Sequence, residues 1–447
     1  MRIKKTKTKT ILLSLLGIVI ILNTRSITTF AKERYSDLQL FTKVLNLVQE
    51  YYVENVDTKK LIYGGIKGML KELDPHTNFL PPEIYKEFES ETSGEFGGLG
   101  IEITIQKGVL TVISPIEDTP AWNAGVKAGD KIVTINGEST KGFSLAEAAK
   151  KMRGKKNSTV NLGIFRDGFE DPKVFSIKRG VVKIRSAKYT DLGDGYAYVK
   201  LTSFIENTYD DLKKQLEEHK KKHKEIKGLL IDLRKNPGGL LTQATKISDL
   251  FLSEGVIVST IGRNEKEKEV VYAKKSGTIE SFPLVIIIDE YSASASEILA
   301  GALQDNKRAL IMGKRSFGKG SVQSVVKLGD GSGLKLTVAR YYTPSGVSIQ
   351  AEGIHPDVEL EDLDTKTIVK ARQNKKVRRE KDIKGHLLSE KEKKALNQAN
   401  NKVLDFWWTE ESDKKKEQTP KDKLLRDDFQ VFQAFNYLKA WSVMKKM

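Results

Sequence analysis

The chain has 447 residues, of which 39% are hydrophobic and 30% charged, and its formal net charge is +17. This length exceeds what a single hydrophobic core supports, and the composition excludes collagenous, disordered and polytopic membrane proteins. The sequence contains no cysteine, which also excludes disulfides, cysteine nucleophiles and thiolate metal sites.

Histidine offers little for a metal site. No pair forms an HExxH motif, and only His219 and His223 share helical spacing, in a lysine-rich run over 217–224. That run is typical of a solvent-exposed face rather than a zinc site. We therefore expect chemistry that needs no metal and no other cofactor. The histidines are His76, His219, His223, His355 and His386.

The first 31 residues have the pattern of an export signal. Five cations over 1–10 precede an apolar run over 11–22, and a small-residue cleavage motif ends at Ala31. Twelve apolar residues are few for a membrane span of about 20. The pattern predicts export across the cytoplasmic membrane, to the periplasm or another extracytoplasmic place. A cleaved signal peptide and a retained membrane anchor both remain open.

The segment 32–92 is expected to be helical, because apolar residues fall at helical spacing from Ser36 to Glu72. Asp74-Pro75 ends this pattern, and a proline-bounded loop follows. His76 lies in that loop, where we interpret it as a structural hydrogen-bonding group rather than a catalytic one.

Short strands and glycine turns occupy 93–179. A strand and an Asn136-Gly137 hairpin turn follow the turn at Gly129-Asp130, and Ser144 with Glu147 forms a helix capping box. In this order the features resemble a bacterial, protease-associated PDZ domain, a β-rich module that binds protein C-termini.

The resemblance assigns peptide binding to one loop and strand. Backbone N–H groups of Gly98, Leu99 and Gly100 would hold a C-terminal carboxylate, and the peptide would pair with the strand beginning at Ile101. We expect an apolar final side chain of the peptide to contact Leu99 and Ile101. The alternative is that the glycines only form a tight turn.

Strands and helices alternate over 180–360, which predicts an α/β core of βαβ units. Continuous apolar strands over 228–233 and 283–288 are typical of a buried parallel sheet. Ligands bind at the carboxyl ends of such strands. Three segments with polar and glycine residues follow strands there: 232–239, 292–297 and 313–323.

The second and third of these segments offer candidates for a nucleophile and a base. A serine at a strand-to-helix turn lies near a helix N-terminus, which favours a developing anion. Peptide hydrolysis needs such a nucleophile, a base and oxyanion donors. Since no histidine is suitably placed, a lysine kept neutral is the remaining base, and Lys319 stands between two glycines.

These segments resemble the carboxy-terminal processing peptidases, or tail-specific proteases, in co-linear order over about residues 35–358. The resemblance implies that Ser294 is the nucleophile of a serine endopeptidase and Lys319 its base. Gln323, one helical turn further on, would orient the lysine. The oxyanion donors would be the N–H of Ala295 and one from Gly238 or Gly239. Tyr291 departs from the family pattern of small or amide residues and puts substrate preference in question.

The tail over 361–447 is basic and expected to be helical in pieces. From Thr365 to Met447 there are 22 Lys and Arg against 12 Asp and Glu, the pattern of a solvated face or of an anion-binding tail. Trp407 and Trp408 suggest a docking point. The stripe Phe429, Val431, Phe432, Phe435 and Leu438 needs a partner surface, in the chain or on another subunit.

The expected substrates are proteins or peptides with free apolar C-termini. An adaptor, a homo-oligomer and a membrane surface remain open as partners. A catalytically silent PDZ scaffold is the main alternative function. Nucleic-acid binding is not expected, because it requires basic and aromatic residues on one ordered platform, whereas most of the excess charge lies in one tail.

Overall fold

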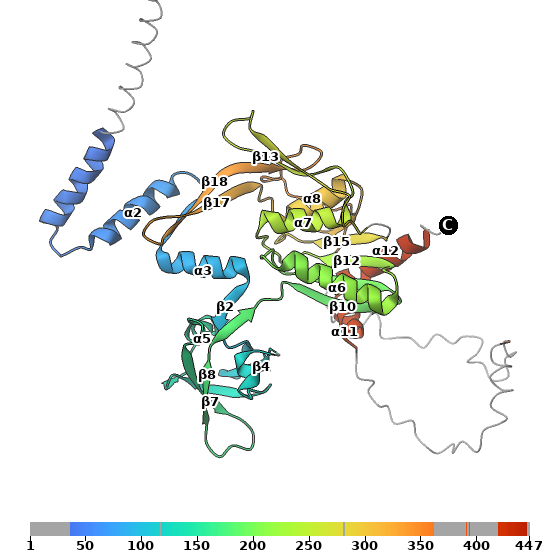
Figure 1. The fold of residues 1–447 in the computed structure, drawn as a ribbon, viewed down its shortest axis with the longest axis horizontal. Coiled ribbons are helices and arrows are strands. Elements are labelled where there is room, and N and C mark those ends of the chain that lie inside the picture. Colours follow the sequence, from blue (N-terminus) through green and yellow to red (C-terminus); the bar gives the residue numbers. More distant parts are fainter. Residues whose placement is uncertain are drawn as a thin grey trace, which may run out of the picture. The chain divides into compact units, whose positions relative to one another are not determined.

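The computed structural model describes residues 36–116, 118–279, 282–361, 390, 393 and 419–444 (Figure 1). The expected export signal and the Trp407-Trp408 pair lie outside the described residues. The chain divides into two compact units, Met1–Glu83 with Ser324–Leu336, and Ile84–Gln323 with Thr337–Met447. Within the described part, each helix is too short or too polar to cross a lipid bilayer.

The first unit confirms the predicted N-terminal helices. One covers 36–51, and α2 covers Thr58–Lys71, with Asp57 accepting a 2.8 Å hydrogen bond from the N–H of Lys59. The Asp-Pro-His loop is a turn in which Asp74 Oδ1 accepts from the N–H of His76 at 2.8 Å. Strand β1 (Asn78–Leu80) pairs antiparallel with residues 333–335, the start of β18 (Gly333–Tyr342).

The predicted PDZ domain is β-rich and lies within the second of the two compact units. Its sheet has the order β3-β4-β5-β7-β8, with β6 paired to β5, so β3 is an edge strand. The capping box of Ser144 and Glu147 and the positive φ angles of Asn136 and Gly137 are as predicted. A separate two-stranded sheet of β2 and β9 flanks the domain in the sequence. The elements over 82–183 are α3 (Pro82–Ser93), β2 (Glu95–Gly98), β3 (Ile101–Gln106), β4 (Val109–Pro115), α4 (Pro120–Asn123), β5 (Lys131–Ile135), β6 (Glu138–Ser139), α5 (Leu145–Met152), β7 (Thr159–Phe165), β8 (Lys173–Lys178) and β9 (Gly180–Lys183).

The α/β core is a six-stranded sheet with the order β10-β11-β12-β15-β16-β19. β10 and β11 are antiparallel, and the remaining neighbours are parallel. The central strands β12 and β15 are wholly buried, as their continuous apolar runs predicted. The strands are β10 (Ala187–Gly193), β11 (Tyr196–Leu201), β12 (Gly228–Asp232), β15 (Leu284–Ile288), β16 (Leu310–Gly313) and β19 (Val358–Glu359).

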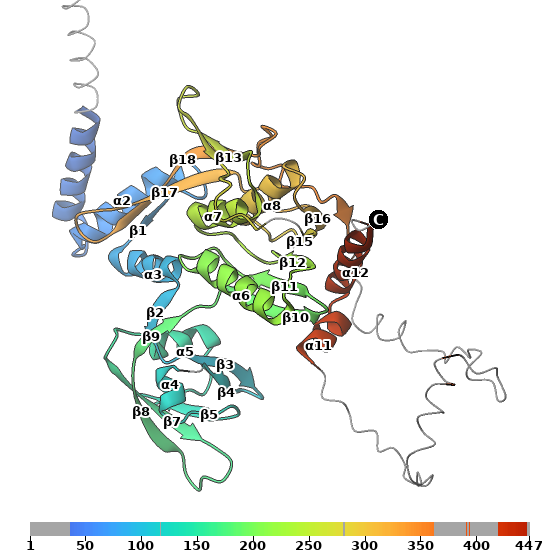
Figure 2. The ribbon, with the colours of Figure 1, turned by 45° about the vertical axis from the view of Figure 1, so that its right-hand side comes forward.

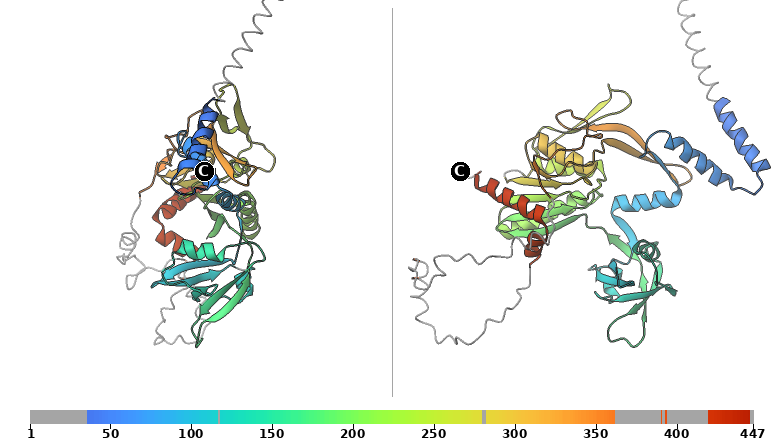
Figure 3. Two further views of the ribbon diagram at one scale, coloured as in Figure 1. Left: turned by 90° about the vertical axis from the view of Figure 1, so that its left-hand side faces the viewer. Right: turned by 180° about the vertical axis from the view of Figure 1, so that it is seen from behind.

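Helices cover both faces of this sheet (Figure 2). Leu229 and Ile231 of β12 pack into the cluster with α6 (Thr208–His223), α7 (Leu241–Phe251) and α8 (Ala295–Asp305). Leu230, between them, faces the opposite cluster with α12 (Phe429–Met444), which follows α11 (Pro420–Asp427) (Figure 3). The C-terminal apolar stripe therefore finds its partner surface within the chain.

One sequence-based prediction about α6 is wrong. His219 is only 2% exposed, although its lysine-rich surroundings predicted a solvent face. It follows Leu212 and Leu216 at helical spacing, and both leucines are buried against the sheet. The lysines of this helix occupy its other faces.

Candidate active site

The three predicted segments meet at the carboxyl edge of the core sheet. They follow β12, β15 and β16, which are adjacent and parallel, so their loops leave the sheet at one edge. Backbone hydrogen bonds join the loops, from the N–H of Ala293 to the carbonyl of Asn236 at 3.0 Å and from the N–H of Phe317 to the carbonyl of Ser292 at 3.0 Å.

Ser294 occupies a strained position at the N-terminus of α8. Its φ is 55° and its ψ is −113°, values that L-residues rarely adopt. Such backbone strain gathers at functional sites. The residue is 8% exposed, and the helix dipole places partial positive charge beside it.

The neighbouring serines have structural tasks. Ser292 Oγ donates to the carbonyl of Leu233 at 2.9 Å, and Ser296 Oγ donates to the carbonyl of Asn236 at 3.0 Å. Ser294 Oγ donates no hydrogen bond to any residue that the structure describes. Of the three hydroxyls, Ser294 is thus the one whose proton is not already committed to the fold.

Glu297 joins the serine loop to the lysine loop. Its carboxylate accepts hydrogen bonds from the backbone N–H of Ser294 at 2.7 Å, of Gly318 at 2.6 Å and of Lys319 at 2.9 Å, and from Ser316 Oγ at 2.6 Å. Burial raises the pKa of Glu297, and these four donors oppose that rise. The sequence prediction gave this residue no role, although its position three residues after Ser294 fits a capping box.

Gly238 lies directly against Ser294. A Cβ at this position would lie 2.8 Å from the Ser294 Cβ and 2.9 Å from the Ala295 nitrogen. The N–H of Gly238 donates to Asn236 Oδ1 at 2.9 Å, whereas the N–H groups of Gly239 and Ala295 donate to no described residue. Those two groups are therefore the better placed to serve an oxyanion.

Gln323 belongs to a strand, β17 (Ser321–Lys327), which pairs with β18. The prediction that it lies one helical turn beyond Lys319 is wrong, because this segment is extended. Its amide nitrogen donates to Ser321 Oγ at 2.8 Å. Residues 340–342 of β18 pair with β13 (Val256–Ile261), which in turn pairs with β14 (Lys268–Tyr272).

The predicted peptide-binding loop has unused backbone donors. The carbonyls of Leu99 and Gly100 accept from the N–H of Ala121 at 2.9 Å and of Ile116 at 2.8 Å. Their own N–H groups donate to no residue in the described ranges, although both residues are buried. The Leu99 side chain is 3% exposed and packs in the domain core, and the expected contact between it and a bound peptide side chain stays a prediction.

A buried ion network stands beside these loops and was not foreseen. Arg234 donates to Asp232 Oδ2 at 2.7 Å and to Asp428 Oδ2 at 2.6 Å, and Tyr198 OH also donates to Asp232 at 2.8 Å. Asp232 is wholly buried. The network ties the loop after β12 to the residue before α12. Nothing in the sequence indicated that residues 194 positions apart would meet.

Comparisons with known families define the class of protein. The Peptidase family S41 model matches residues 195–360, and a PDZ domain model matches residues 111–166. A third model, the activating protease CtpB N-terminal domain, matches residues 22–83. The α/β core with its strained serine is therefore that of a serine peptidase, and it is joined to a PDZ domain.

Individual relatives define the family. A carboxy-terminal-processing protease of Bartonella bacilliformis is 44% identical over 76% of this chain and 79% of its own length. CtpB, a carboxy-terminal processing protease of Bacillus subtilis, is 37% identical over 74% and 69%. Among solved structures, the photosystem II D1 C-terminal processing protease is 32% identical over 72% of this chain and 92% of that chain, with a TM-score of 0.42. The chain belongs to the carboxy-terminal processing protease family.

Proposed function

We propose that the protein is an exported serine endopeptidase that captures the C-terminal tails of protein substrates through its PDZ domain and hydrolyses them with Ser294, Lys319 and Gln323. Carboxy-terminal processing by the relatives supports the substrate class, since their names describe action on C-termini. The N-terminal cationic and apolar pattern supports export.

The proposed reaction has two acyl-transfer steps. Lys319, in its neutral form, takes the proton of Ser294 Oγ as that oxygen attacks the scissile carbonyl carbon. The N–H groups of Ala295 and Gly239 stabilise the oxyanion, and Lys319 gives its proton to the leaving amine. Water then attacks the acyl-enzyme with Lys319 again as base, which releases the new carboxylate and restores Ser294. Gln323 is the proposed positioning residue for the lysine.

One observation carries this proposal. The Glu297 carboxylate accepts from the backbone N–H of both Ser294 and Lys319, which binds the nucleophile loop and the base loop to one buried group. Two segments 25 residues apart in the sequence are thereby held together. A scaffold that only binds tails has no need of such a link, so the link favours an enzyme over the silent PDZ alternative.

Alanine and arginine variants test the proposal. Ser294→Ala removes one hydroxyl and should abolish cleavage of an unstructured protein substrate, while a Ser292→Ala control retains most of it. Lys319→Ala should be equally inactive, and so should Lys319→Arg, because a guanidinium does not release its proton near neutral pH. Product formation is followed by mass spectrometry, with circular dichroism to verify folding. Cleavage by folded Ser294→Ala, or by Lys319→Arg, would contradict the mechanism.

A further inference from the structure

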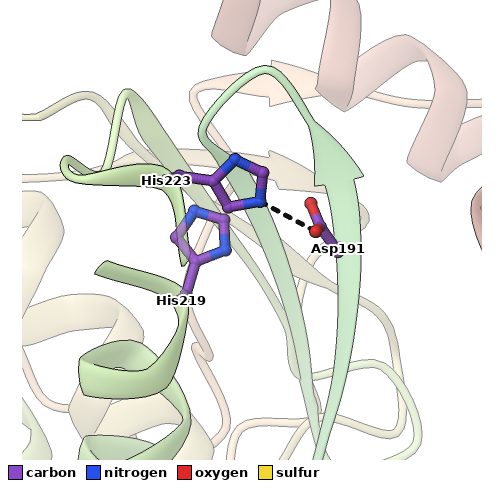
Figure 4. Close-up of side chains that lie close together, drawn as sticks. All are labelled: Asp191, His219 and His223. Atoms are coloured by element: carbon purple, nitrogen blue, oxygen red, sulfur yellow. Dashed lines mark hydrogen bonds and ion pairs between the residues drawn. The ribbon is translucent and has the colours of Figure 1, made fainter. Parts of the chain in front are cut away.

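Asp191, His219 and His223 form a cluster at the end of α6 and on β10, apart from the residues proposed for peptide hydrolysis. Their nitrogen and oxygen ligand atoms all lie within 4.8 Å of one another. The histidines are four residues apart on one helix face, and their ring centroids are 4.6 Å apart. Figure 4 shows the two rings side by side, with the Asp191 carboxylate next to His223.

The buried histidine of this cluster has one nitrogen to spare. Tyr189 OH occupies His219 Nδ1 at 2.6 Å, and His219 Nε2 is buried with no hydrogen-bond partner among the described residues. Buried polar atoms are nearly always paired, so an unpaired one calls for an explanation. The hydrogen bond from Tyr189 to Nδ1 also fixes the orientation of the His219 ring. Metal-ligating histidines are usually oriented by such a bond to the nitrogen that does not bind the metal.

The other two groups can reach the same point. Asp191 Oδ1 accepts from the N–H of Gly193 at 2.8 Å, which orients the carboxylate, and Oδ2 accepts from His223 Nε2 at 2.8 Å and from Lys222 Nζ at 2.7 Å. The Lys222 side chain is 67% exposed, so it can move into solvent at little cost. The side chains of Asp191 and His223 are about one-fifth exposed, which gives an ion a path from solvent.

We propose that Asp191, His219 and His223 bind one divalent transition-metal ion, for which Zn²⁺ is the natural probe. Two imidazole nitrogens and one carboxylate oxygen suit Zn²⁺ or its first-row neighbours, whereas Mg²⁺ and Ca²⁺ prefer oxygen ligands. Ligand atoms of a tetrahedral zinc site are about 3.3 Å apart. The 2.8 Å between Asp191 Oδ2 and His223 Nε2 must therefore widen, and any pair near the 4.8 Å limit of the cluster must close. Water would complete the coordination.

The surroundings of the site limit its role. The end of α6 favours a cation through the helix dipole, but several nearby lysines oppose it, so we expect moderate affinity. The site contains none of the residues proposed for catalysis. Its effect is to link α6 to β10, which adds stability to the folded core without entering the reaction.

The competing arrangement is a metal-free cluster, here called the brace, in which hydrogen bonds alone hold these side chains together. In it the proton of His219 stands on Nε2, directed at the backbone of Gly195, and Nδ1 accepts from Tyr189 OH. His219 then has no lone pair for a metal. The two arrangements differ in whether the folded protein binds zinc through these side chains.

Metal titration of the full chain, without a polyhistidine tag, separates them. The stripped protein is titrated with Zn²⁺ against a chromophoric chelator and with Co²⁺ by visible absorption. We expect one ion per chain, tetrahedral Co²⁺ bands, and a Tm that rises with Zn²⁺. Asp191→Asn and His223→Gln should weaken binding at least tenfold and remove the bands. The matched control His355→Gln changes an exposed histidine elsewhere and should bind as wild type.

Each outcome decides the question. No zinc bound by wild type, or equal binding by folded His223→Gln, means a brace or an adventitious ion and overturns the proposal. His223 is partly exposed, so its variant is expected to fold even where Asp191→Asn does not. A chelator should lower the Tm but leave unchanged the cleavage rate measured at temperatures well below the Tm. The result of this test is therefore separate from that of the peptidase mechanism.

Discussion

At the scale of single residues, Glu297 is the side chain on which the geometry of the candidate active site depends. It is fully buried and accepts four hydrogen bonds from two loops. A carboxylate can accept all four, whereas an amide must turn its NH₂ group toward at least one donor. This difference makes the residue testable by a nearly isosteric change.

Glu297→Gln should lower both activity and stability. We expect the cleavage rate to fall at least about tenfold and the free energy of unfolding to fall by about 1–3 kcal/mol, the usual cost of an unsatisfied buried donor. Steady-state cleavage and urea unfolding measure the two effects. Glu290→Gln, an exposed neighbour, is the matched control. Wild-type activity in Glu297→Gln would show that the link between the loops does not position the reacting groups.

The backbone strain at Ser294 predicts a second effect. With φ at 55° and ψ at −113°, the position suits glycine better than any residue with a Cβ. Strain of this kind is worth about 1–3 kcal/mol, and the flexibility of glycine in the unfolded chain offsets part of it. Ser294→Gly should therefore be more stable than Ser294→Ala by about 1 kcal/mol, while both are inactive. Equal urea midpoints for the two variants would show that the turn is not strained.

At the scale of elements, the loop after β12 and the helix α12 are joined through charge. Burial alone would raise the pKa of Asp232, but hydrogen bonds from Arg234 and its charge outweigh burial and hold that pKa below its ordinary value. A carboxyl whose pKa is lower in the folded state stabilises the fold at any pH above the pKa it has in the unfolded chain, about 3.9. This contribution is lost as the pH falls from that value through the lower pKa of the folded state.

Stability should therefore decrease as the pH falls from about 5 through 4 and below. In Asp232→Asn the decrease should be shallower, because one group that takes up a proton on unfolding is gone, although the variant is less stable at neutral pH. Urea unfolding at a series of pH values measures both slopes. Asp249→Asn, which changes an aspartate outside this network, should retain the wild-type slope. Parallel slopes for wild type and Asp232→Asn would contradict the assignment.

At the scale of the whole molecule, the proposed function assigns recognition to the PDZ domain and chemistry to the α/β core. β3 is an edge strand, and the buried N–H groups of Leu99 and Gly100 just before it donate to no described residue. Unused donors beside an open strand edge are what a peptide with a free carboxylate would occupy. This arrangement supports the proposed capture of tails through backbone donors and strand pairing.

The C-terminal residue of a substrate should therefore control the rate at which the substrate is cleaved. An unstructured protein that ends in a free apolar residue should be cut about tenfold faster than the same protein with an amidated end or with two terminal aspartates, a difference of about 1.4 kcal/mol in capture. Initial rates below saturation measure this. The buried Leu99 is unsuitable for mutation, because a charge there would unfold the domain. Equal rates for the three substrates would remove tail recognition from the proposed function.

The sequence was sufficient for the parts of the fold that depend on local patterns. Apolar runs predicted the buried strands β12 and β15, the Ser144–Glu147 spacing predicted a capped helix, and Asn136-Gly137 predicted a hairpin turn. The family resemblance supplied Ser294 and Lys319 as candidates. Each of these features lies within a few consecutive residues, so neighbouring side chains and backbone preferences determine it.

Only the tertiary structure decided which distant groups meet and which are buried. His219 stands among lysines yet faces the core, because the register of α6 against the sheet, and not the local charge, sets its exposure. Glu297 contacts the lysine loop, and Arg234 contacts Asp428. These residues are far apart in the sequence, and no local sequence pattern predicts that they meet. Leu99 turns its side chain inward for the same reason. Side-chain burial and long-range pairing follow from how elements pack together, which a pattern of neighbouring residues does not encode.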